Sequence, residues 1–132
     1  MKINEIINEN VSNDELSKVE KYADSLWKKM NVDVDFSRHF ADRVNDPRNG
    51  KPISAAELVR IFKKEYERNG KQISQLDDPE AVMKDTGTNI NLPFALNPMH
   101  NRKNMVAKTV MRKPNFYTPD KEFVVNERDK DN

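Results

Sequence analysis

The amino-acid sequence predicts an α+β protein in which N-terminal helices pack on a small antiparallel β-sheet. Up to Gly70, apolar residues recur every three or four positions, which is the period of an amphipathic helix. After Gly70 they alternate with a period of two, which is typical of half-buried strands. A block of helices followed by a block of strands indicates the α+β class.

The composition is that of one soluble domain. The 132 residues are 36% hydrophobic and 34% charged, and no stretch approaches the roughly 20 apolar residues that cross a bilayer. With no cysteine, the chain has no disulfide and no thiolate metal site. We expect a flexible N-terminal segment over residues 1–11, a single α+β domain over 12–126 and a disordered charged tail over 127–132. The expected location is the cytoplasm, with no membrane contact.

The first long helix is predicted to begin at Ser12, after a short helix over residues 2–9. Ser12 and Glu15 have the spacing of a capping box, in which each side chain bonds the other residue's backbone amide. One apolar stripe then follows at helical spacing, formed by Leu16, Val19, Ala23, Leu26, Trp27 and Met30.

A second helix is predicted over residues 36–45, after a short extended link over 32–36. Phe36, Phe40 and Val44 form its buried side. The sequence "DPRNG" ends it, because the residue before a proline disfavours the helix and Asn-Gly favours a turn.

The third helix has a second capping box, formed by Ser54 and Glu57. Asn69-Gly70 is predicted to end this helix. Its inward stripe is expected to share one core with a strand over 90–96, through Leu58, Phe62, Tyr66, Ile90, Leu92 and Phe94.

Further strands are predicted over residues 105–113 and 122–125, with a fourth over 72–76. Pro93 has no amide N–H to donate, so the strand that contains it is predicted to be an edge strand or to be bulged. An unbroken strand over 105–113 has two faces, one with Met105, Ala107, Thr109 and Met111 and one with Val106, Lys108, Val110 and Arg112.

The charge of the chain is unevenly distributed. The net charge is only +1, but residues 86–119 contain five Lys or Arg and no Asp or Glu. A single acid-free basic segment in a nearly neutral protein indicates a local anionic partner.

His39 and Arg43 are the first candidates for chemistry. They stand four residues apart, which places both side chains on one helix face at the margin of the predicted core. An imidazole beside a guanidinium suits acid–base work on a phosphodiester, because histidine titrates near neutral pH. The structural alternative is a histidine that is hydrogen-bonded within the fold.

The basic segment is the second candidate. Lys108 and Arg112 alternate with apolar residues, and Tyr117 follows as a platform on which a base can stack. The same segment supplies further candidate contacts to nucleic acid, namely Arg102, Lys103 and Lys113. The alternative is that these charges form an ordinary solvated face. No metal or cofactor is expected, since two distant histidines, no cysteine and three glycines match no metal or nucleotide motif.

Several of these residues also form a recognisable pattern. "H-F-x-x-R-V" at 39–44, then Arg48, then "I-S-x-x-E-L" at 53–58, with basic strands after them, resembles the RelE-like and barnase-like ribonuclease superfold. The whole chain is also similar to short proteins that tailed bacteriophages encode. The resemblance implies helices on an antiparallel sheet and cleavage of RNA without a metal. His39, Arg43 and Arg48 match the helical motif, and Lys108, Thr109 and Arg112 lie in the basic-strand region.

Two classes of function follow. As a metal-independent endoribonuclease, the protein uses His39 as acid or base, holds the scissile phosphate with Arg43 and Arg48, and steadies the developing charge with Lys108 and Arg112. The alternative is a non-catalytic phage protein that binds host nucleic acid or a host protein, or a structural protein associated with the virion. The expected partner in the first class is RNA or another single-stranded nucleic acid.

Overall fold

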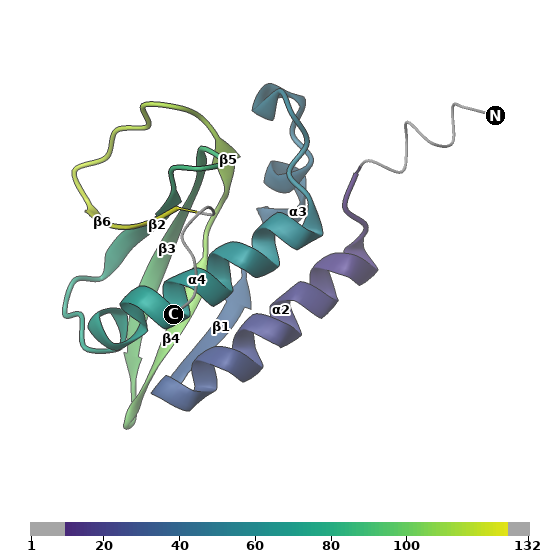
Figure 1. Ribbon diagram of the computed structural model, residues 1–132. Helices are drawn as coiled ribbons and strands as arrows, with labels where there is room; N and C mark the ends of the chain where they lie inside the picture. Colours follow the sequence, from purple (N-terminus) through teal and green to yellow (C-terminus); the bar gives the residue numbers. More distant parts are fainter. Residues whose placement is uncertain (1–9, 127–132) are drawn as a thin grey trace.

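The computed structural model describes residues 10–126 and confirms the α+β class. Figure 1 shows the elements, which in chain order are α2 (Asn13–Trp27), the 3-10 turn η1 (Lys28–Met30), β1 (Val32–Phe36), α3 (Phe40–Val44), the 3-10 turn η2 (Pro47–Asn49), α4 (Ala55–Ser74), β2 (Glu80–Asp85), β3 (Ile90–Met99), β4 (Arg102–Ala107), β5 (Met111–Arg112) and β6 (Lys121–Val125). The helix predicted over 2–9 and the tail predicted over 127–132 lie outside the described residues.

The domain includes Val11, which the sequence analysis assigned to a flexible segment. Val11 is buried in the core, and both its amide and its carbonyl are hydrogen-bonded to the side chain of Asn45 at 2.9 Å. The folded part of the chain therefore begins before the cap of α2. Within residues 10–126, no helix is both long enough and apolar enough to cross a membrane.

The sheet is mixed, so the expectation of an antiparallel sheet is wrong. Its strand order is β1-β4-β3-β2-β6, and β5 pairs with β3 beside β4. The two edge strands run parallel to their neighbours, β1 to β4 and β6 to β2, whereas β3 is antiparallel to both β2 and β4. Parallel pairing needs a long crossover, and the helices α3 and α4 lie within the one that joins β1 to the rest of the sheet.

Both long helices begin where their capping boxes predict. In α2 the Ser12 hydroxyl accepts from the Glu15 amide, and the Glu15 carboxylate accepts from the Ser12 amide. Ser54 and Glu57 form the same pair at the start of α4. The predicted end of α4 at Gly70 is wrong, because the helix continues through it to Ser74 and includes most of the strand predicted over 72–76.

Gly70 lies inside α4 and does not form a turn. A Cβ at this position meets the side chains of Met30 and Tyr66 at 3.6 Å, which is ordinary contact distance. Gly70 is buried beside η1, and an alanine methyl group fits here in ordinary contact with both side chains.

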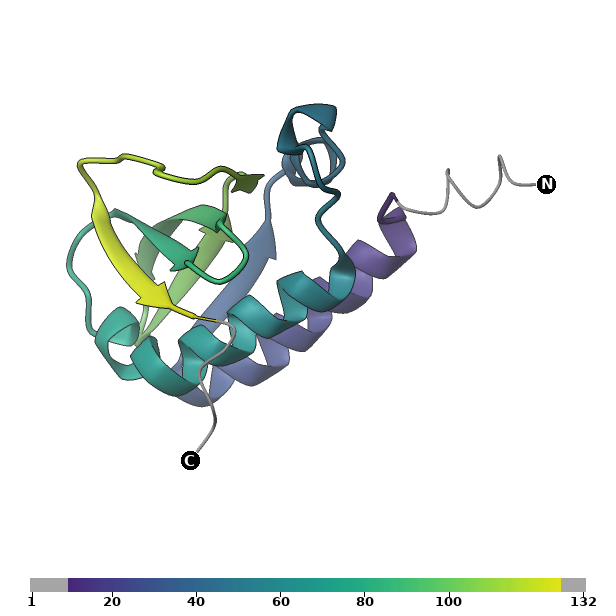
Figure 2. The ribbon, with the colours of Figure 1, turned by 45° about the horizontal axis from the view of Figure 1, so that its top comes forward.

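The predicted core is confirmed. Figures 1 and 2 show α2 and α4 side by side along the curved sheet. Leu58, Phe62, Ile90, Leu92 and Phe94 are fully buried between α4 and the sheet, and Tyr66 packs at the margin. Trp27 helps to join the long helices: its indole nitrogen donates to the Phe62 carbonyl at 3.3 Å, and its ring meets the Tyr66 ring edge to face.

The predicted link over 32–36 and the predicted helix over 36–45 form a strand and a shorter helix. Phe36 ends β1, and α3 covers only Phe40–Val44. The two phenyl rings still stack, with centroids 4.3 Å apart, because the intervening turn folds Phe40 back onto Phe36. The residues "VDVDF" alternate apolar and acidic side chains, which is a strand period that the short length concealed.

The outer edge of β1 is bonded to α2. The amides of Val34 and Phe36 point away from β4, and they donate to the carboxylates of Asp24 at 2.9 Å and Glu20 at 2.7 Å. Asp24 and Glu20 stand one helical turn apart on α2, so a single helix face satisfies both edge amides.

The strand predicted over 105–113 is interrupted by a bulge. β3 pairs with β4 up to Phe94↔Ala107 and with β5 from Asn91↔Met111. Three residues, 108–110, therefore lie opposite two residues of β3, which is the definition of a β-bulge. Pro93 is one of those two, so its missing N–H falls where strand pairing stops, and its carbonyl accepts from the Lys108 amide at 3.0 Å. The strand that contains Pro93 is neither an edge nor bulged, because β3 is central and pairs without interruption with β2; the extra residue lies in the opposing segment 108–110.

The bulge exchanges the two faces of the segment. Met105 and Ala107 are fully buried, and the next buried residue is Val110 rather than Thr109. Thr109 and Met111 are half-buried and leave the core-facing side. The predicted alternation over 105–113 is therefore wrong beyond Ala107, since one extra residue inverts the register of all that follow.

Candidate functional site

A cavity of about 830 Å³ lies between the segment that contains α3 and η2 and the bulged segment that leads into β5. One wall is built from residues within 39–49 and the other from residues 108–114. All five residues predicted for catalysis line it, namely His39, Arg43, Arg48, Lys108 and Arg112, and Lys113 lines it as well. The structure thus brings together residues that are about 70 positions apart in the sequence.

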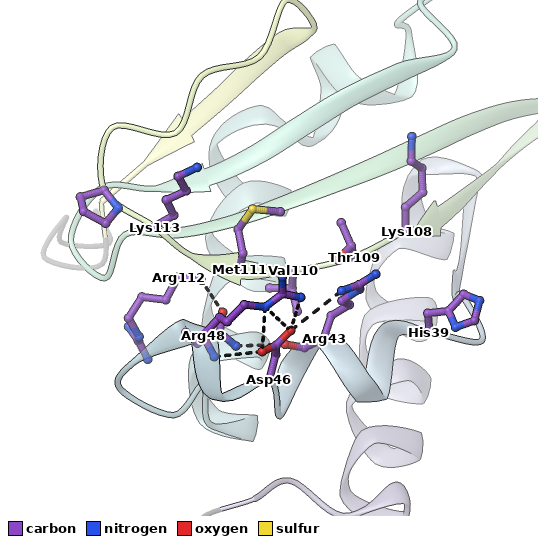
Figure 3. A pocket seen from close by; sticks show the side chains of 12 residues that line it. His39, Arg43, Asp46, Arg48, Lys108, Thr109, Val110, Met111, Arg112 and Lys113 are labelled. Carbon is purple, nitrogen blue, oxygen red and sulfur yellow. Dashed lines mark hydrogen bonds and ion pairs between the residues drawn. The ribbon is translucent and has the colours of Figure 1, made fainter.

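His39 stands at one end of the cavity. It precedes α3, whose inward residues Phe40 and Val44 are buried, so His39 and Arg43 are left on the exposed side of the short helix. The imidazole forms no hydrogen bond within residues 10–126, and Figure 3 shows it pointing away from the side chain of Arg43. His39 is therefore not held by the fold, and it does not form a direct pair with Arg43.

Both arginines of this wall gather around Asp46. The Arg48 guanidinium donates from Nε and Nη2 to the two carboxylate oxygens of Asp46, at 3.1–3.2 and 2.7 Å, and Arg43 Nη1 lies 3.9 Å from Oδ2. Asp46 also caps η2 by accepting from the Arg48 amide at 2.9 Å. These hydrogen bonds from Arg48 lower the pKa of Asp46 to about 2. Asp46 is a site residue that the sequence analysis missed, although an Asp that precedes Pro and then Arg is a recognisable turn-capping pattern.

Arg112 has a structural role. Its guanidinium donates to the carbonyls of Lys51, Pro52 and Thr88 at 2.8–3.0 Å, and Nη2 donates to the Glu57 carboxylate at 2.8 Å. Its side chain is nearly buried, and Figure 3 shows it turned away from Arg43 and Arg48. Burial raises the pKa of Glu57, but the hydrogen bonds from Arg112 and Ser54 outweigh this and lower it. Arg112 therefore ties the start of α4 to β5 and is not available to hold a phosphate.

Asn49 joins the two walls. Its side-chain amide donates to the carbonyls of Arg43 at 3.0 Å and Val44 at 3.2 Å, and its Oδ1 accepts from the Arg112 amide at 3.1 Å. Asn49 is almost completely buried, so these bonds are not exchanged with water. The sequence analysis interpreted Asn49 only as part of a turn, because its partner in β5 is remote in the chain.

The second wall carries Lys108 and Lys113. The Lys108 ammonium lies 3.0 Å from the Glu80 carboxylate, and both side chains are exposed. Lys113 is exposed, and no residue within 10–126 pairs with its ammonium group. Figure 3 shows both lysines on the same side of their strand as Met111, with Met111 between them. This wall therefore presents an apolar side chain flanked by two cations.

The remaining predicted nucleic-acid contacts lie outside the cavity. Arg102 is bonded to Asp33, whose pKa it lowers chiefly through that hydrogen bond. The Lys103 ammonium donates to the Leu76 carbonyl. Tyr117, 84% exposed, follows β5 and does not line the cavity. Arg102 and Lys103 thus hold the β3–β4 hairpin to its neighbours.

The cavity can bind an anion, and its rim offers one exposed imidazole for proton transfer. Asp46 is its only carboxylate among the described residues, and it is paired with arginine. Within residues 10–126, no three His, Cys, Asp or Glu side chains are grouped so that they could hold a metal ion. No protein-family model, curated protein or solved structure matches the chain.

Proposed function

We propose that the cavity binds single-stranded RNA through its phosphates. The observation that carries this proposal is that Arg43 and Arg48 on one wall and Lys108 and Lys113 on the other line the same cavity. Guanidinium and ammonium groups are the usual partners of phosphate oxygens. The volume of about 830 Å³ is of the size that accepts a nucleotide, and the concave shape favours an unpaired strand over a rigid duplex.

The hydrogen bonds that hold the cationic walls in place support a binding site rather than an ordinary charged surface. Asp46 holds Arg48 in one orientation, so less side-chain entropy is lost when a phosphate binds. Asn49 fixes this wall against β5, so the spacing between the arginines and the lysines is set before the ligand arrives. A preorganised set of cations around a cavity favours a specific anion over loose adhesion.

The binding test is fluorescence anisotropy with a labelled single-stranded RNA, repeated over a range of salt concentrations. Lys113→Ala is expected to weaken binding and to lower the salt slope by about 0.7, the value for one phosphate contact on a single strand. Lys63→Ala, which removes an exposed lysine of α4 outside the cavity, is the matched control and leaves affinity and slope unchanged. Equal effects of the two variants, or no binding by the wild type, contradict the proposal and favour the protein-binding or structural alternatives.

A second candidate function, metal-independent cleavage of the bound RNA, is favoured by one observation. His39 lines the same cavity, is exposed and has no hydrogen-bonded partner for its ring within the described residues. In this reaction the ribose 2′-oxygen attacks the adjacent phosphorus, the bond to the 5′-oxygen breaks, and a cyclic phosphate forms. His39 either takes the proton from the 2′-hydroxyl or gives one to the departing 5′-oxygen, while Arg43 and Arg48 hold the phosphate.

Cleavage is tested by incubating the protein with RNA in EDTA and examining the products on a gel. His39→Ala is expected to lower the rate by about 10²–10⁴-fold, the contribution of one general acid or base. His100→Ala replaces the other histidine, which does not line the cavity, and is expected to retain the wild-type rate. Intact RNA with the wild type, together with retained binding, shows that the cavity binds without cutting.

A further inference from the structure

We propose that Met111 contacts the nucleobase of the bound RNA, packing its thioether against the face of the ring. This inference rests on the proposed function, because it assigns the base to a cavity whose cations are proposed to hold the phosphates. The observation behind it is the bulge over residues 108–110, which turns Met111 out of the core and into the cavity wall.

The position of Met111 has no structural explanation in the core. Met105, Ala107 and Val110 fill the inward side of this segment and are completely buried. In an unbroken strand Met111 continues the row of Met105 and Ala107, but the extra residue places it on the opposite side. A half-exposed methionine loses part of the hydrophobic stabilisation that burial gives, so the exposure has a cost that a ligand contact can offset.

The neighbours of Met111 match the parts of a nucleotide. Lys108 lies on one side of it and Lys113 on the other, and the three side chains point the same way in Figure 3. Lys108 and Lys113 are five steps apart along the chain, which span at most about 16 Å and accommodate two successive phosphates with one nucleoside between them. Pro114, the residue after Lys113, also lines the cavity and adds a second apolar surface.

The chemistry of methionine suits this contact. Its unbranched side chain is flexible and its sulfur is polarizable, so it forms favourable contacts with aromatic rings of differing shape. Such a contact does not involve the hydrogen-bonding groups of the base, so any of the four bases can occupy the position. The cavity is therefore inferred to take single-stranded RNA with little sequence preference at this nucleotide, and to discriminate against polyanions that lack bases.

The test compares two ligands of similar charge, a short single-stranded RNA and inorganic polyphosphate. Met111→Ala is expected to weaken RNA binding about two- to tenfold, the range for a sulfur–aromatic contact, and to leave polyphosphate binding unchanged. The salt slope for RNA stays constant, because no charge is removed. Met111→Leu is expected to retain most of the affinity through its remaining apolar surface. Met99→Ala, a half-exposed methionine on the β3–β4 hairpin, is the matched control and changes neither ligand.

Two results overturn the inference while leaving the proposed function intact. Equal weakening of RNA and polyphosphate by Met111→Ala shows that Met111 supports the wall and does not contact a base. Unchanged RNA binding by that variant shows that the base lies elsewhere. Failure of the wild-type protein to bind RNA at all is a different outcome, since it removes the proposed function itself. Thermal melting of each variant, checked against the wild type, ensures that only folded protein is compared.

Discussion

Replacing Glu65 with Gln is expected to remove most of the pH dependence of stability. Glu65 lies on α4 and is completely buried, where its carboxylate accepts from the Asn69 side chain at 2.9 Å and from the Lys84 amide at 3.3 Å. Burial is the main cause that raises the pKa of Glu65, and the nearby carboxylate of Asp85 adds to it, while the two hydrogen bonds oppose it. The result is a pKa of about 8 in place of 4.5.

The direction of the effect follows from proton linkage. Between pH 4.5 and 8 the unfolded chain loses the proton of Glu65, whereas the folded protein keeps it. The folded state then binds more protons, so the free energy of unfolding falls as the pH rises through this window and levels off above pH 8. Each tenfold difference in proton affinity is worth about 1.4 kcal/mol, which gives a total loss of about 4–5 kcal/mol as an upper estimate.

The experiment is urea unfolding from pH 5 to 9, followed by the fluorescence of Trp27. This residue is the only tryptophan and is fully buried between α2 and α4, so its emission reports the packing of the helix that carries Glu65. Glu65→Gln is expected to match the wild type near pH 5 and to exceed it at pH 9 by several kcal/mol. Glu67→Gln, at an exposed position of the same helix, keeps the wild-type profile. Parallel pH profiles for wild type and Glu65→Gln refute the reasoning.

Three further predictions concern the core and the cavity. Phe62→Ala is expected to lower the free energy of unfolding by about 3–5 kcal/mol, because Phe62 is fully buried, and an unchanged urea midpoint contradicts the described packing. Asn49→Ala removes the side-chain partner of the Val44 carbonyl and of the Arg112 amide, and one of the partners of the Arg43 carbonyl, so we expect a loss of about 1–3 kcal/mol and weaker RNA binding in anisotropy measurements. Glu80→Gln frees Lys108 from its ion pair and is expected to tighten RNA binding about two- to fivefold, with no gain when Lys108 is also replaced by Ala.

Local features of the sequence predicted the local features of the fold. The two capping boxes depend on residues three positions apart, and both helices begin there. The apolar stripe of α4 and the alternation of β3 identified the buried residues between them. Each period can be recognised within its own segment, without knowledge of the segment that packs against it. The convergence of His39, Arg43 and Lys108 on one cavity was also expected from their types and positions.

Features that depend on remote partners were not predicted. The residues 32–36 form a strand because β4 lies beside them, and nothing in five residues indicates that neighbour. Arg112 was expected to hold a phosphate. Its guanidinium instead donates hydrogen bonds to backbone carbonyls of the loop before α4 and of the β2–β3 turn, which are remote in the sequence. The position of Met111 depends on a single extra residue in the pairing with β3, which a strand pattern cannot distinguish from an unbroken strand.

The bonds from Asp24 and Glu20 to the outer amides of β1 have a consequence for how the chain is made. An open strand edge is a template for aggregation until it is paired or covered. Because α2 precedes β1 in the chain, the helix that protects this edge leaves the ribosome before the strand does. The sheet neighbour β4, in contrast, is synthesised only after α4, β2 and β3. During that interval α2 can cover one edge of β1 and so prevent that edge from pairing with other nascent chains. The strand that waits longest for a sheet partner therefore has one edge protected as soon as it is made.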